Sequence, residues 1–313
     1  MSIKIDKRKN LVIAAVGDQS LHVHWKLLKR ADFDLFLIYY GEEEGYEQSC
    51  RYHVKKKGTK FHLIADMFDE RPDLFDYEYI WMPDDDIYIK SGDIERLFKI
   101  AKRYDLWLCQ PSIIGWYGLD VTLHHKNSLL RYTNYVEIMC PCFQSEALRK
   151  CISTFRENKT GWGVDSLWNI KLEHPTDRIA IIDDVVAIHT RPVGGGDMYK
   201  KQANNSIDNA LKEAYDLYDK YNLAEENYID LKKGRAVSQE SFSTKYFSTV
   251  EYNSVYKSTE AGVPVEERMW PPIDILRTLC EEVRVNRSSE TCSASNLCAK
   301  ASDSQRRSEE QVE

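Results

Sequence analysis

Short apolar runs alternate with segments of helical spacing along much of the chain. Each run is compact and ends at a glycine or at polar residues, which is typical of buried strands. The runs predicted as strands are 11–16, 33–40, 61–65, 79–82, 106–109, 135–139 and 179–182.

Amphipathic helices are predicted between these strands. Ser20 can cap a segment in which apolar residues recur at helical spacing, and Ser91 begins a second helix with one apolar face. A third apolar stripe runs from 207 to 221. Apolar strands that alternate with such helices predict an α/β fold, in which helices flank a mostly parallel central sheet.

The composition changes along the chain and predicts its organisation. A domain is predicted over 1–225, followed by a C-terminal extension over 226–286 that contains a short helix at 273–283. The remaining stretch, 287–313, is rich in serine and has few large apolar residues, so it is predicted to be a disordered tail.

Charge and leader signals narrow the class of protein. The 313 residues carry a formal net charge of −7, which argues against a general nucleic-acid binder because such proteins present basic surfaces. The N-terminus has no apolar core of a signal peptide, and no apolar stretch is long enough to span a membrane. The expectation is therefore a cytoplasmic protein without a membrane span.

Eight cysteines are scattered along the chain without the paired spacing of a zinc site. Several lie inside apolar runs, which predicts small buried side chains in a reducing compartment. Cys140 and Cys142, on either side of Pro141, could bind a metal or be redox-active, but core packing is the favoured interpretation.

Glycine, tyrosine or aspartate residues stand at or just after the ends of four of the predicted strands. Since ligands of parallel sheets bind beyond the carboxyl ends of the strands, these residues predict one binding crevice. They are Gly17 and Asp18, Tyr39 and Tyr40, Asp66, and Asp84, Asp85 and Asp86.

The triple aspartate is the strongest chemical signal. An apolar strand and Pro83 lead directly into it, and alternate residues of an extended segment share a face, so Asp84 and Asp86 point the same way. Two carboxylates on one face predict a hard divalent cation, Mg²⁺ or Mn²⁺, that would clamp a diphosphate. The alternatives are a solvated acidic loop and a haloacid-dehalogenase phosphatase, although Tyr88 stands where that enzyme class has threonine.

A loop of glycines around Trp162 precedes Asp165. Asp165 is predicted to begin a helix, where the helix dipole favours the ionised carboxylate, and such a carboxylate can act as the general base for a sugar hydroxyl. The alternative is an N-cap aspartate beside a packing tryptophan.

His189 ends the apolar run that begins at 179, and Arg191 follows on the same side. An imidazole at this position can complete the protein ligands of the metal, and the guanidinium can pair with a phosphate. Glycines 194–196 would let a loop close over the predicted diphosphate ligand. The alternative is that His189 is a core residue whose ring is hydrogen-bonded within the protein.

Together these motifs resemble GT-A glycosyltransferases. The order of the Gly17-Asp18 strand, the DxD cluster, the Gly-Trp-Gly-x-Asp loop and the late His189 carries the resemblance, over roughly residues 9 to 200. The sequence around these motifs also looks like that of an uncharacterised-domain family of bacteria and plants that is related to these enzymes. The segments that carry this likeness are 61–64, 81–86, 110–112, 130–134, 136–139 and 189–192.

The resemblance implies a nucleotide-sugar donor with Mn²⁺ or Mg²⁺ on Asp84 and Asp86 together with His189, and Asp165 as the base. It leaves open which aspartate binds the metal directly and which meets the ribose. The expected reaction moves a sugar from a UDP- or GDP-sugar to a hydroxyl of a carbohydrate or glycan acceptor, with inversion because Asp165 supplies a base.

Further residues complete the predicted site, and those on the acceptor side are also interpretable as packing residues. Donor contacts are predicted for Gly17, Asp18, Tyr39, Tyr40, Asp66, Asp85 and Arg191, and acceptor contacts for Gln110, Trp116 and Trp162. Two other functions remain open: a metal-dependent phosphohydrolase, and a nucleotide-sugar-binding or scaffolding protein without turnover.

Overall fold

The computed structural model describes residues 8–25, 31–43, 50, 52–116, 120–125, 128–192, 206–223 and 236–238. The chain divides into two units, Met1–Gly262 and Val263–Glu313, and every described residue belongs to the first. The predicted helix 273–283, the predicted tail 287–313 and glycines 194–196 lie outside the described residues. The domain boundaries at 225 and 286 therefore stay predictions.

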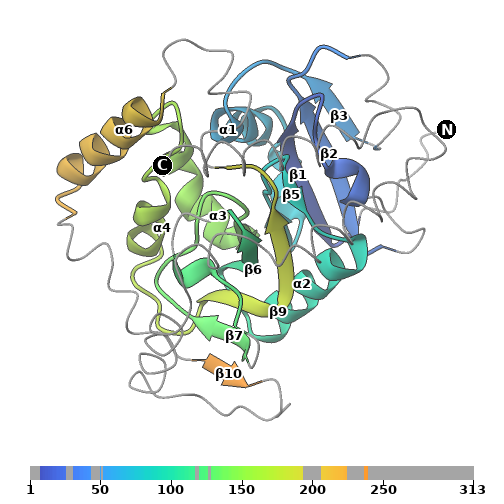
Figure 1. Ribbon diagram of the computed structural model, residues 1–313, viewed down its shortest axis with the longest axis vertical. Coiled ribbons are helices and arrows are strands. Elements are labelled where there is room, and N and C mark those ends of the chain that lie inside the picture. The colour runs from blue at the N-terminus through green and yellow to red at the C-terminus, as the bar shows by residue number, and fades with distance from the viewer. Residues whose placement is uncertain are drawn as a thin grey trace, which may run out of the picture. The chain divides into compact units, whose positions relative to one another are not determined.

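Ten strands form one sheet at the centre of the first unit (Figure 1). The strands are β1 (Asn10–Val16), β2 (Phe33–Tyr39), β3 (Tyr52–Lys55), β4 (Tyr79–Trp81), β5 (Ile87–Tyr88), β6 (Leu108–Gly115), β7 (Ser128–Tyr132), β8 (Cys142–Gln144), β9 (Ile179–His189) and β10 (Ala236–Ser238). Their order is β10-β7-β9-β6-β8-β4-β1-β2-β3, and β5 pairs with β9.

The direction of the strands brings four carboxyl ends to one edge. β1 is parallel to β2 and to β4, and β6 is parallel to β9. β8 is antiparallel to both β4 and β6, so these two antiparallel steps restore the direction of β4 in β6 and β9. The ends of β1, β2, β4 and β9 therefore lie at the same edge, where ligands of α/β sheets bind.

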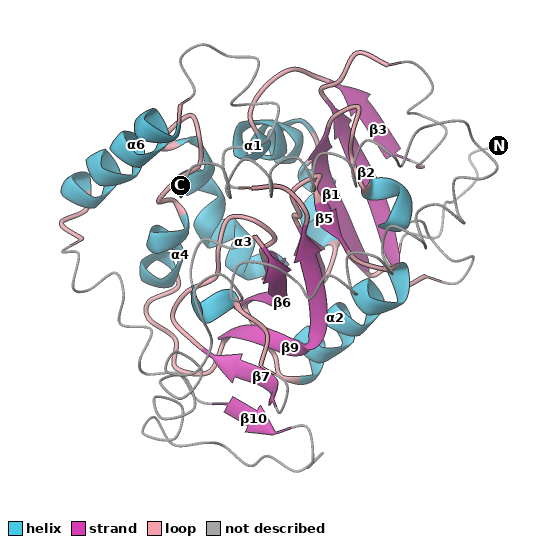
Figure 2. Ribbon diagram, in the orientation of Figure 1, coloured by secondary structure: helices cyan, strands magenta, loops and turns pink. Residues whose placement is uncertain are grey.

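Helices cover both faces of the sheet (Figure 2). The α-helices are α1 (Lys60–Glu70), α2 (Ser91–Arg103), α3 (Ser145–Cys151), α4 (Asp165–Lys171) and α6 (Ile207–Lys220). The short 3-10 helices are η1 (His22–Trp25), η3 (Pro72–Asp76), η4 (Asp120–Thr122) and η5 (Ile152–Arg156).

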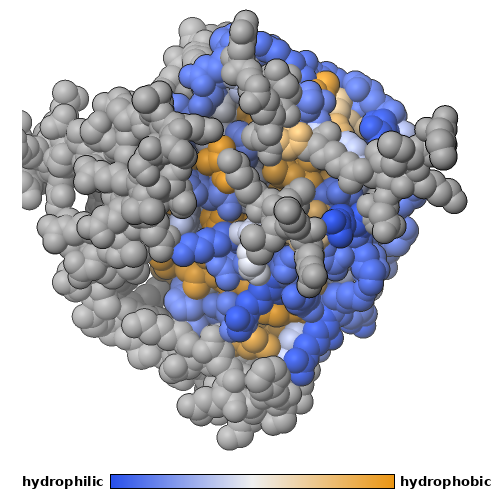
Figure 3. Space-filling view, turned by 90° about the vertical axis from the view of Figure 1, so that its right-hand side faces the viewer, coloured by the Kyte–Doolittle hydropathy of each residue, from blue (hydrophilic) through white to orange (hydrophobic). Residues whose placement is uncertain are grey.

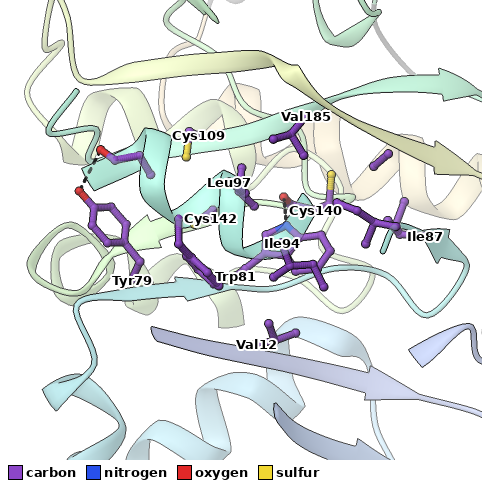
Figure 4. Close-up of a cluster of buried hydrophobic side chains, with 14 of the residues drawn as sticks. Val12, Tyr79, Trp81, Ile87, Ile94, Leu97, Cys109, Cys140, Cys142 and Val185 are labelled. Carbon is purple, nitrogen blue, oxygen red and sulfur yellow. Dashed lines mark hydrogen bonds between the residues drawn. The ribbon is translucent and has the colours of Figure 1, made fainter. Parts of the chain in front are cut away.

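The side-chain alternation of the strands divides the core in two. Val12 in β1 packs in a cluster with Leu97 of α2, and Figure 4 shows part of this cluster. The next residue, Ile13, belongs to the opposite cluster, which contains Phe61 of α1 and Trp168 of α4. A strand buried on both faces reads as a continuous apolar run, which is why β1 and β2 could be predicted from their sequence.

The α/β class with a central sheet between helices is confirmed, and the sheet is mixed. The strands that carried the prediction, β1, β2 and β4, are parallel. The antiparallel contribution comes mainly from β5, β7 and β8. β5 and β8 are only two and three residues long, too short to leave a periodic pattern in the sequence.

The prediction of a strand at 61–65 is wrong, because this segment lies in α1. Phe61, Ile64, Ala65 and Phe68 are all buried, and their spacing of three and four residues is that of one helix face. Residues 61–65 alone look like a short buried strand. The spacing of the apolar residues continues at helical intervals to Phe68, which identifies a helix.

The prediction of a strand at 135–139 is also wrong. This segment has no regular secondary structure, because side chains bind its backbone groups in place of a neighbouring strand. Gln110 Oε1 accepts the amide of Glu137 at 2.7 Å, and Lys60 Nζ donates to the carbonyl oxygen of Ile138 at 2.7 Å. The segment follows β7 directly and lies beside the predicted site.

The remaining predictions for regular elements agree with the structure in outline. Helices begin at Ser91, Asp165 and Ile207, and the strand predicted at 106–109 is found at 108–115. The segment after Ser20 forms the short helix η1, and Leu28 lies outside the described residues.

Neither the surface in view in Figure 3 nor the helices show the features of a membrane-spanning segment within the described residues. On the face seen in Figure 3, hydrophilic side chains cover much of the described surface, with hydrophobic patches between them. Within the described ranges, no helix combines the length and the apolar character that a bilayer crossing needs.

Candidate functional site

The three aspartates occupy the turn between β4 and β5. The amide of Ile87 donates to the carbonyl oxygen of Asp84 at 3.2 Å, which closes the turn. β5 then pairs antiparallel with the end of β9, so that Ile87 lies opposite His189. Thr190 fixes the same junction, because its hydroxyl donates to the carbonyl oxygen of Asp86 at 2.8 Å. This pairing brings His189 and Arg191 beside the aspartates.

Asp85 binds three segments of the chain through its buried carboxylate. Its Oδ2 accepts the amide of Gly17 at 2.9 Å and the hydroxyl of Tyr40 at 2.6 Å. Its Oδ1 accepts Arg191 Nη1 at 3.0 Å, and Arg191 Nη2 also donates to the carbonyl oxygen of Gln19 at 2.7 Å. The middle aspartate therefore joins the loops that follow β1, β2 and β9.

Gly17 is required by this close approach. A Cβ atom at that position would lie 2.7 Å from the ring of Tyr40, closer than real Cβ contacts. Asp18, next along the loop, accepts the hydroxyl of Tyr39 and the backbone amides of Glu42 and Glu43. Both predicted donor pairs, Gly17-Asp18 and Tyr39-Tyr40, thus lie together at the edge of the sheet.

Asp84 is held by a lysine that the sequence analysis did not identify. Lys60, the first residue of α1, places Nζ 2.7 Å from Asp84 Oδ1 and also donates to the carbonyl oxygens of Ile138 and Met139 at 2.7 and 3.0 Å. The side chain of Asp84 remains 37% exposed, whereas that of Lys60 is 15% exposed. A carboxylate with this much exposure is open to a ligand from solvent.

Asp86 and His189 form the third pair. His189 Nε2 lies 3.4 Å from Asp86 Oδ2. Burial alone would lower the pKa of His189, but the contact with Asp86 and the charges of Asp86 and Asp84 raise it to about 9. Burial would raise the pKa of Asp86, and His189 reverses this so that the pKa is lowered. At neutral pH the two side chains are therefore an ion pair.

Each aspartate thus has a cation of its own: Lys60 with Asp84, Arg191 with Asp85, and His189 with Asp86. The cations come from α1 and from the end of β9, far from the aspartates in sequence. Like charges in close proximity disfavour folding unless they are compensated, and this pairing supplies the compensation. The turn can therefore form without a metal ion.

The residues nevertheless fit a divalent cation at Asp86 and His189. Asp86 Oδ1 is buried and has no hydrogen-bond partner, which leaves a carboxylate oxygen available. His189 Nδ1 lies 2.7 Å from the carbonyl oxygen of Trp116, so Nδ1 keeps its proton, and a cation that displaces the proton on Nε2 would meet the ring lone pair there. Within the described ranges no three His, Cys, Asp or Glu side chains are already grouped as metal ligands. Asp84, engaged by Lys60, is the remaining candidate for a third ligand.

Asp165 is a buried carboxylate of a different kind. It is 4% exposed at the start of α4, and its Oδ2 accepts the hydroxyl of Tyr135 at 2.6 Å and the amide of Ile138 at 3.2 Å. No described lysine, arginine or histidine forms an ion pair with it. Burial raises the pKa of Asp165 to about 6, against the lowering effect of the Tyr135 hydrogen bond. A carboxylate with a raised pKa is suited to proton transfer near neutral pH.

The 135–139 segment joins Asp165 to the aspartate turn. The amide of Ile138 binds Asp165, and the carbonyl oxygens of Ile138 and Met139 bind Lys60. The carbonyl oxygen of Met139 also accepts the amide of Asp84 at 2.8 Å. One short stretch of backbone therefore separates Asp165 from the aspartate turn.

The Gly-Trp-Gly loop adopts the backbone conformation that glycine favours. Gly161 and Gly163 have φ angles of +84° and +83°, and Cβ atoms would lie 2.7 Å from Phe61 and 3.0 Å from Ala214. The loop is therefore packed between α1 and α6. Trp162, which is partly buried, lies between the two glycines.

Two other predicted acceptor residues contact the site through the backbone. Gln110 is fully buried and binds the amide of Glu137, so it supports the 135–139 segment. Trp116 supplies the carbonyl oxygen that orients His189, and its amide donates to the carbonyl oxygen of His189 at 3.2 Å. The contact of each with an acceptor stays a prediction.

Asp66 does not follow a strand, and its predicted position is wrong. It lies in the middle of α1, where it pairs with Lys56 at 2.8 Å and with Arg156 at 2.8 Å. The error follows from the assignment of 61–65 as a strand. These contacts explain why the pKa of Asp66 is lowered, and none of them links it to the aspartate turn.

The site also contains residues that the sequence analysis missed, above all Lys60 and Tyr135. Both lie directly beside segments that carry the family likeness, 61–64 and 136–139, but nothing in those segments assigns a chemical role to either side chain. Recognising 60–70 as a helix would have placed Lys60 at its first turn. Tyr135 could not have been found without the tertiary structure.

Cys140 and Cys142 pack in the core, which confirms the favoured interpretation of the sequence. Cys109, Cys140 and Cys142 are fully buried, carry free thiols and belong to one apolar cluster (Figure 4). Burial raises the pKa of Cys140 and Cys142 far above the usual value, which disfavours the thiolate needed for metal or redox chemistry. The carbonyl oxygen of Cys140 accepts the indole N–H of Trp81 at 2.9 Å.

Comparisons with known proteins give structural likenesses only. No protein-family model matches the sequence, and no curated protein matches it. Among solved structures, the chain is similar to Staphylococcus aureus TarS in complex with UDP-GlcNAc, at 12% identity and a TM-score of 0.47, over 72% of this chain and 70% of TarS. It is also similar to the mannosyltransferase PcManGT from Pyrobaculum calidifontis in complex with GDP-Man and Mn²⁺, at 14% identity and a TM-score of 0.39, over 59% of this chain and 58% of that protein.

Another TarS structure matches over 57% of this chain and 60% of its own length, at 14% identity and a TM-score of 0.41. The chain thus spans less than two thirds of some of the proteins it resembles. Because these TM-scores are below 0.5, what those proteins bind says nothing by itself about this chain. The function proposed below therefore rests on the side chains of the site.

Proposed function

We propose that this protein is a glycosyltransferase that moves a sugar from a nucleotide-diphosphate donor to a hydroxyl of a carbohydrate acceptor, with inversion at the anomeric carbon. One observation carries the proposal. One backbone segment, beside the carboxyl edge of an α/β sheet, joins Asp86 and His189, which are residues of metal-ligand type, to Asp165, a buried carboxylate with no cationic partner among the described residues.

The donor would bind at the edge formed by the ends of β1, β2, β4 and β9. Asp86 and His189 would hold Mn²⁺ or Mg²⁺, with Asp84 as a further ligand. Such an ion, when bound, neutralises the charge on the departing diphosphate. Arg191 supplies a second positive charge at the same edge, and its guanidinium is already oriented by Asp85 and by the carbonyl oxygen of Gln19.

The remaining donor residues form the wall next to Asp85. Gly17 leaves room for the ring of Tyr40, and Asp18 and Tyr39 are fixed by their mutual hydrogen bond. Tyr40 presents its ring beside Gly17. We assign these residues to the nucleoside portion of a UDP- or GDP-sugar, since an aromatic ring and a carboxylate suit a base and ribose hydroxyls.

Asp165 would act as the general base. In the reaction, the acceptor oxygen forms a bond to the anomeric carbon while the bond from that carbon to the diphosphate oxygen breaks. The proton of the acceptor hydroxyl moves to Asp165. Tyr135 and Ile138 both donate to Oδ2, whereas Oδ1 accepts only the amide of Ser166, at 3.1 Å, so we assign the proton to Oδ1. Trp116 and Trp162 are proposed to contact the acceptor because their rings can stack on sugar faces.

A thermal-shift screen tests the donor site. The expected result is that UDP or GDP raises the melting temperature in the presence of Mn²⁺ and much less without it, because a bound ligand stabilises the native state. Asp86→Ala should remove the shift. Stabilisation by no nucleotide under either condition would contradict the proposal. Turnover of a simple phosphate ester without an acceptor would favour a phosphohydrolase instead.

A further inference from the structure

We propose that Lys60 competes with the divalent cation for Asp84 and thereby limits the affinity of the site for metal, while it holds the segment that carries the general base in place. The inference rests on the proposed function, because it concerns the same metal site. It assigns a role to a residue outside every motif of the sequence.

Lys60 is held independently of Asp84. Its ammonium group has three donors, and three acceptors surround it: Asp84 Oδ1 at 2.7 Å and the carbonyl oxygens of Ile138 and Met139 at 2.7 and 3.0 Å. Two of these acceptors belong to the backbone. The charge therefore stays beside Asp84 whether or not Asp84 turns toward another ligand.

A fixed ammonium beside Asp84 opposes metal binding in two ways. Lys60 already engages one lone pair of Oδ1, so a metal ion competes with the ammonium group for this oxygen and Oδ2 is the freer ligand. The positive charge of Lys60 also repels a divalent cation bound a few ångströms away.

The same lysine supports the base on the other side of the segment. The carbonyl oxygen of Ile138 binds Lys60, and the amide of Ile138 binds Asp165. Loss of the ammonium group would leave both carbonyl oxygens of 138 and 139 without this donor. Lys60 is therefore a positioning residue for Asp165 that acts through the backbone of Ile138.

The two roles predict opposite effects of one substitution. Lys60→Met keeps the length of the aliphatic stem and removes the charge, so metal binding should become tighter while sugar transfer becomes slower. A side chain with only a structural role would weaken both properties when it is removed. Opposite changes thus distinguish the proposal from a general loss of structure.

The test is a titration of the nucleotide-free protein with Mn²⁺, followed by the electron paramagnetic resonance signal of free Mn²⁺. Lys60→Met should lower the Kd by about tenfold, because a unit charge close to the ion is removed. Lys60→Arg, which retains the charge, should bind Mn²⁺ like the wild type. Lys102→Met is the control. Lys102 lies in the last turn of α2 and forms an exposed ion pair with Glu78, so loss of its charge should leave the Kd unchanged.

An unchanged or larger Kd for Lys60→Met would overturn the proposal, provided that its melting temperature stays close to that of the wild type. Should this variant fail to fold, Lys60→Gln keeps a donor for the carbonyl oxygens and is expected to tighten Mn²⁺ binding in the same way. Mn²⁺ binding by neither the wild type nor these two variants would contradict the proposed metal site itself. Binding by the wild type without tightening in the variants would contradict only the role of Lys60.

Discussion

Asp85 and Arg191 form an ion pair in which Oδ1 and Nη1 lie 3.0 Å apart, although 106 residues separate them in the chain. The carboxylate also accepts Gly17 and Tyr40, so one buried side chain fastens the loops after β1, β2 and β9. The middle aspartate of the cluster, whose role the sequence left open, is the structural centre of the proposed donor site.

Asp85→Ala is expected to lower the free energy of unfolding by about 3 kcal/mol or more, because it leaves a largely buried guanidinium without its carboxylate. Urea denaturation followed by circular dichroism measures the change. Asp73→Ala, which breaks the exposed pair between Asp73 and Arg71 at 2.7 Å, is the control and should cost less than about 1 kcal/mol. A loss below about 1 kcal/mol in Asp85→Ala, as expected for the control, would contradict a stabilising role of the network around Asp85.

The pH dependence of transfer is predicted from Asp165. The base is active when ionised, and its pKa is raised to about 6 by burial. The value of kcat/KM should therefore be constant above about pH 7 and fall about tenfold per pH unit below about pH 6. A profile that stays flat down to pH 5 would exclude Asp165 as the general base.

The same raised pKa predicts that Asp165→Asn stabilises the protein while it abolishes transfer. The folded state binds the proton more tightly than the unfolded state, so stability falls as pH rises from about 4 to about 6. At pH 7.5 the buried charge costs about 1 to 3 kcal/mol, which asparagine avoids while its amide oxygen can still accept Tyr135. The melting temperature of Asp165→Asn should therefore exceed that of the wild type at pH 7.5, by a margin that shrinks near pH 4.

Asp183→Asn is the matched control for that experiment. Asp183 is equally buried, but Arg131 pairs with it through both oxygens at 2.7 and 3.0 Å. Removal of its charge leaves the arginine unpaired, so this variant should melt below the wild type. If Asp165→Asn were destabilised like Asp183→Asn, Asp165 would be a structural residue.

The Gly-Trp-Gly loop gives a prediction about backbone conformation. Gly161→Ala should lower the free energy of unfolding by about 1 to 3 kcal/mol, because φ is +84° and the added methyl would meet the ring of Phe61. Gly92→Ala, in the first turn of α2 with no atom within 4 Å of the added Cβ, should be neutral or slightly stabilising. Thermal melting of both variants checks the difference. Similar melting temperatures would mean that the loop can relax.

Elements that bury both faces or one clear stripe could be predicted from the sequence. β1, β2 and β4 are apolar runs, and α2 and α6 have one apolar face each, so their patterns identify them. The start of α1 is a compact apolar run like that of a buried strand, and its helical period becomes evident only when Phe68 is included. β5 and β8 depend on pairing with distant strands, and a pattern of two or three residues carries no period.

The site was predictable where its residues follow strands. Asp84, Asp86 and His189 could be grouped because each stands at the end of an apolar run, and the structure brings Asp86 and His189 within 3.4 Å. The expectation that Asp84 and Asp86 need a metal to offset their charges did not foresee Lys60 and His189 as internal partners. Such pairings arise from tertiary contacts, which local sequence does not encode.

The central claim is tested most directly by release of nucleoside diphosphate from a panel of UDP- and GDP-sugars, with Mn²⁺ and simple sugar acceptors present. The wild type should release the diphosphate from at least one donor, with transfer of the sugar. Asp86→Ala and Asp165→Asn should reduce release by about a hundredfold or more, the scale of losing a bound metal or a general base. Release at the wild-type rate by both variants, or from no donor at all, would contradict the account.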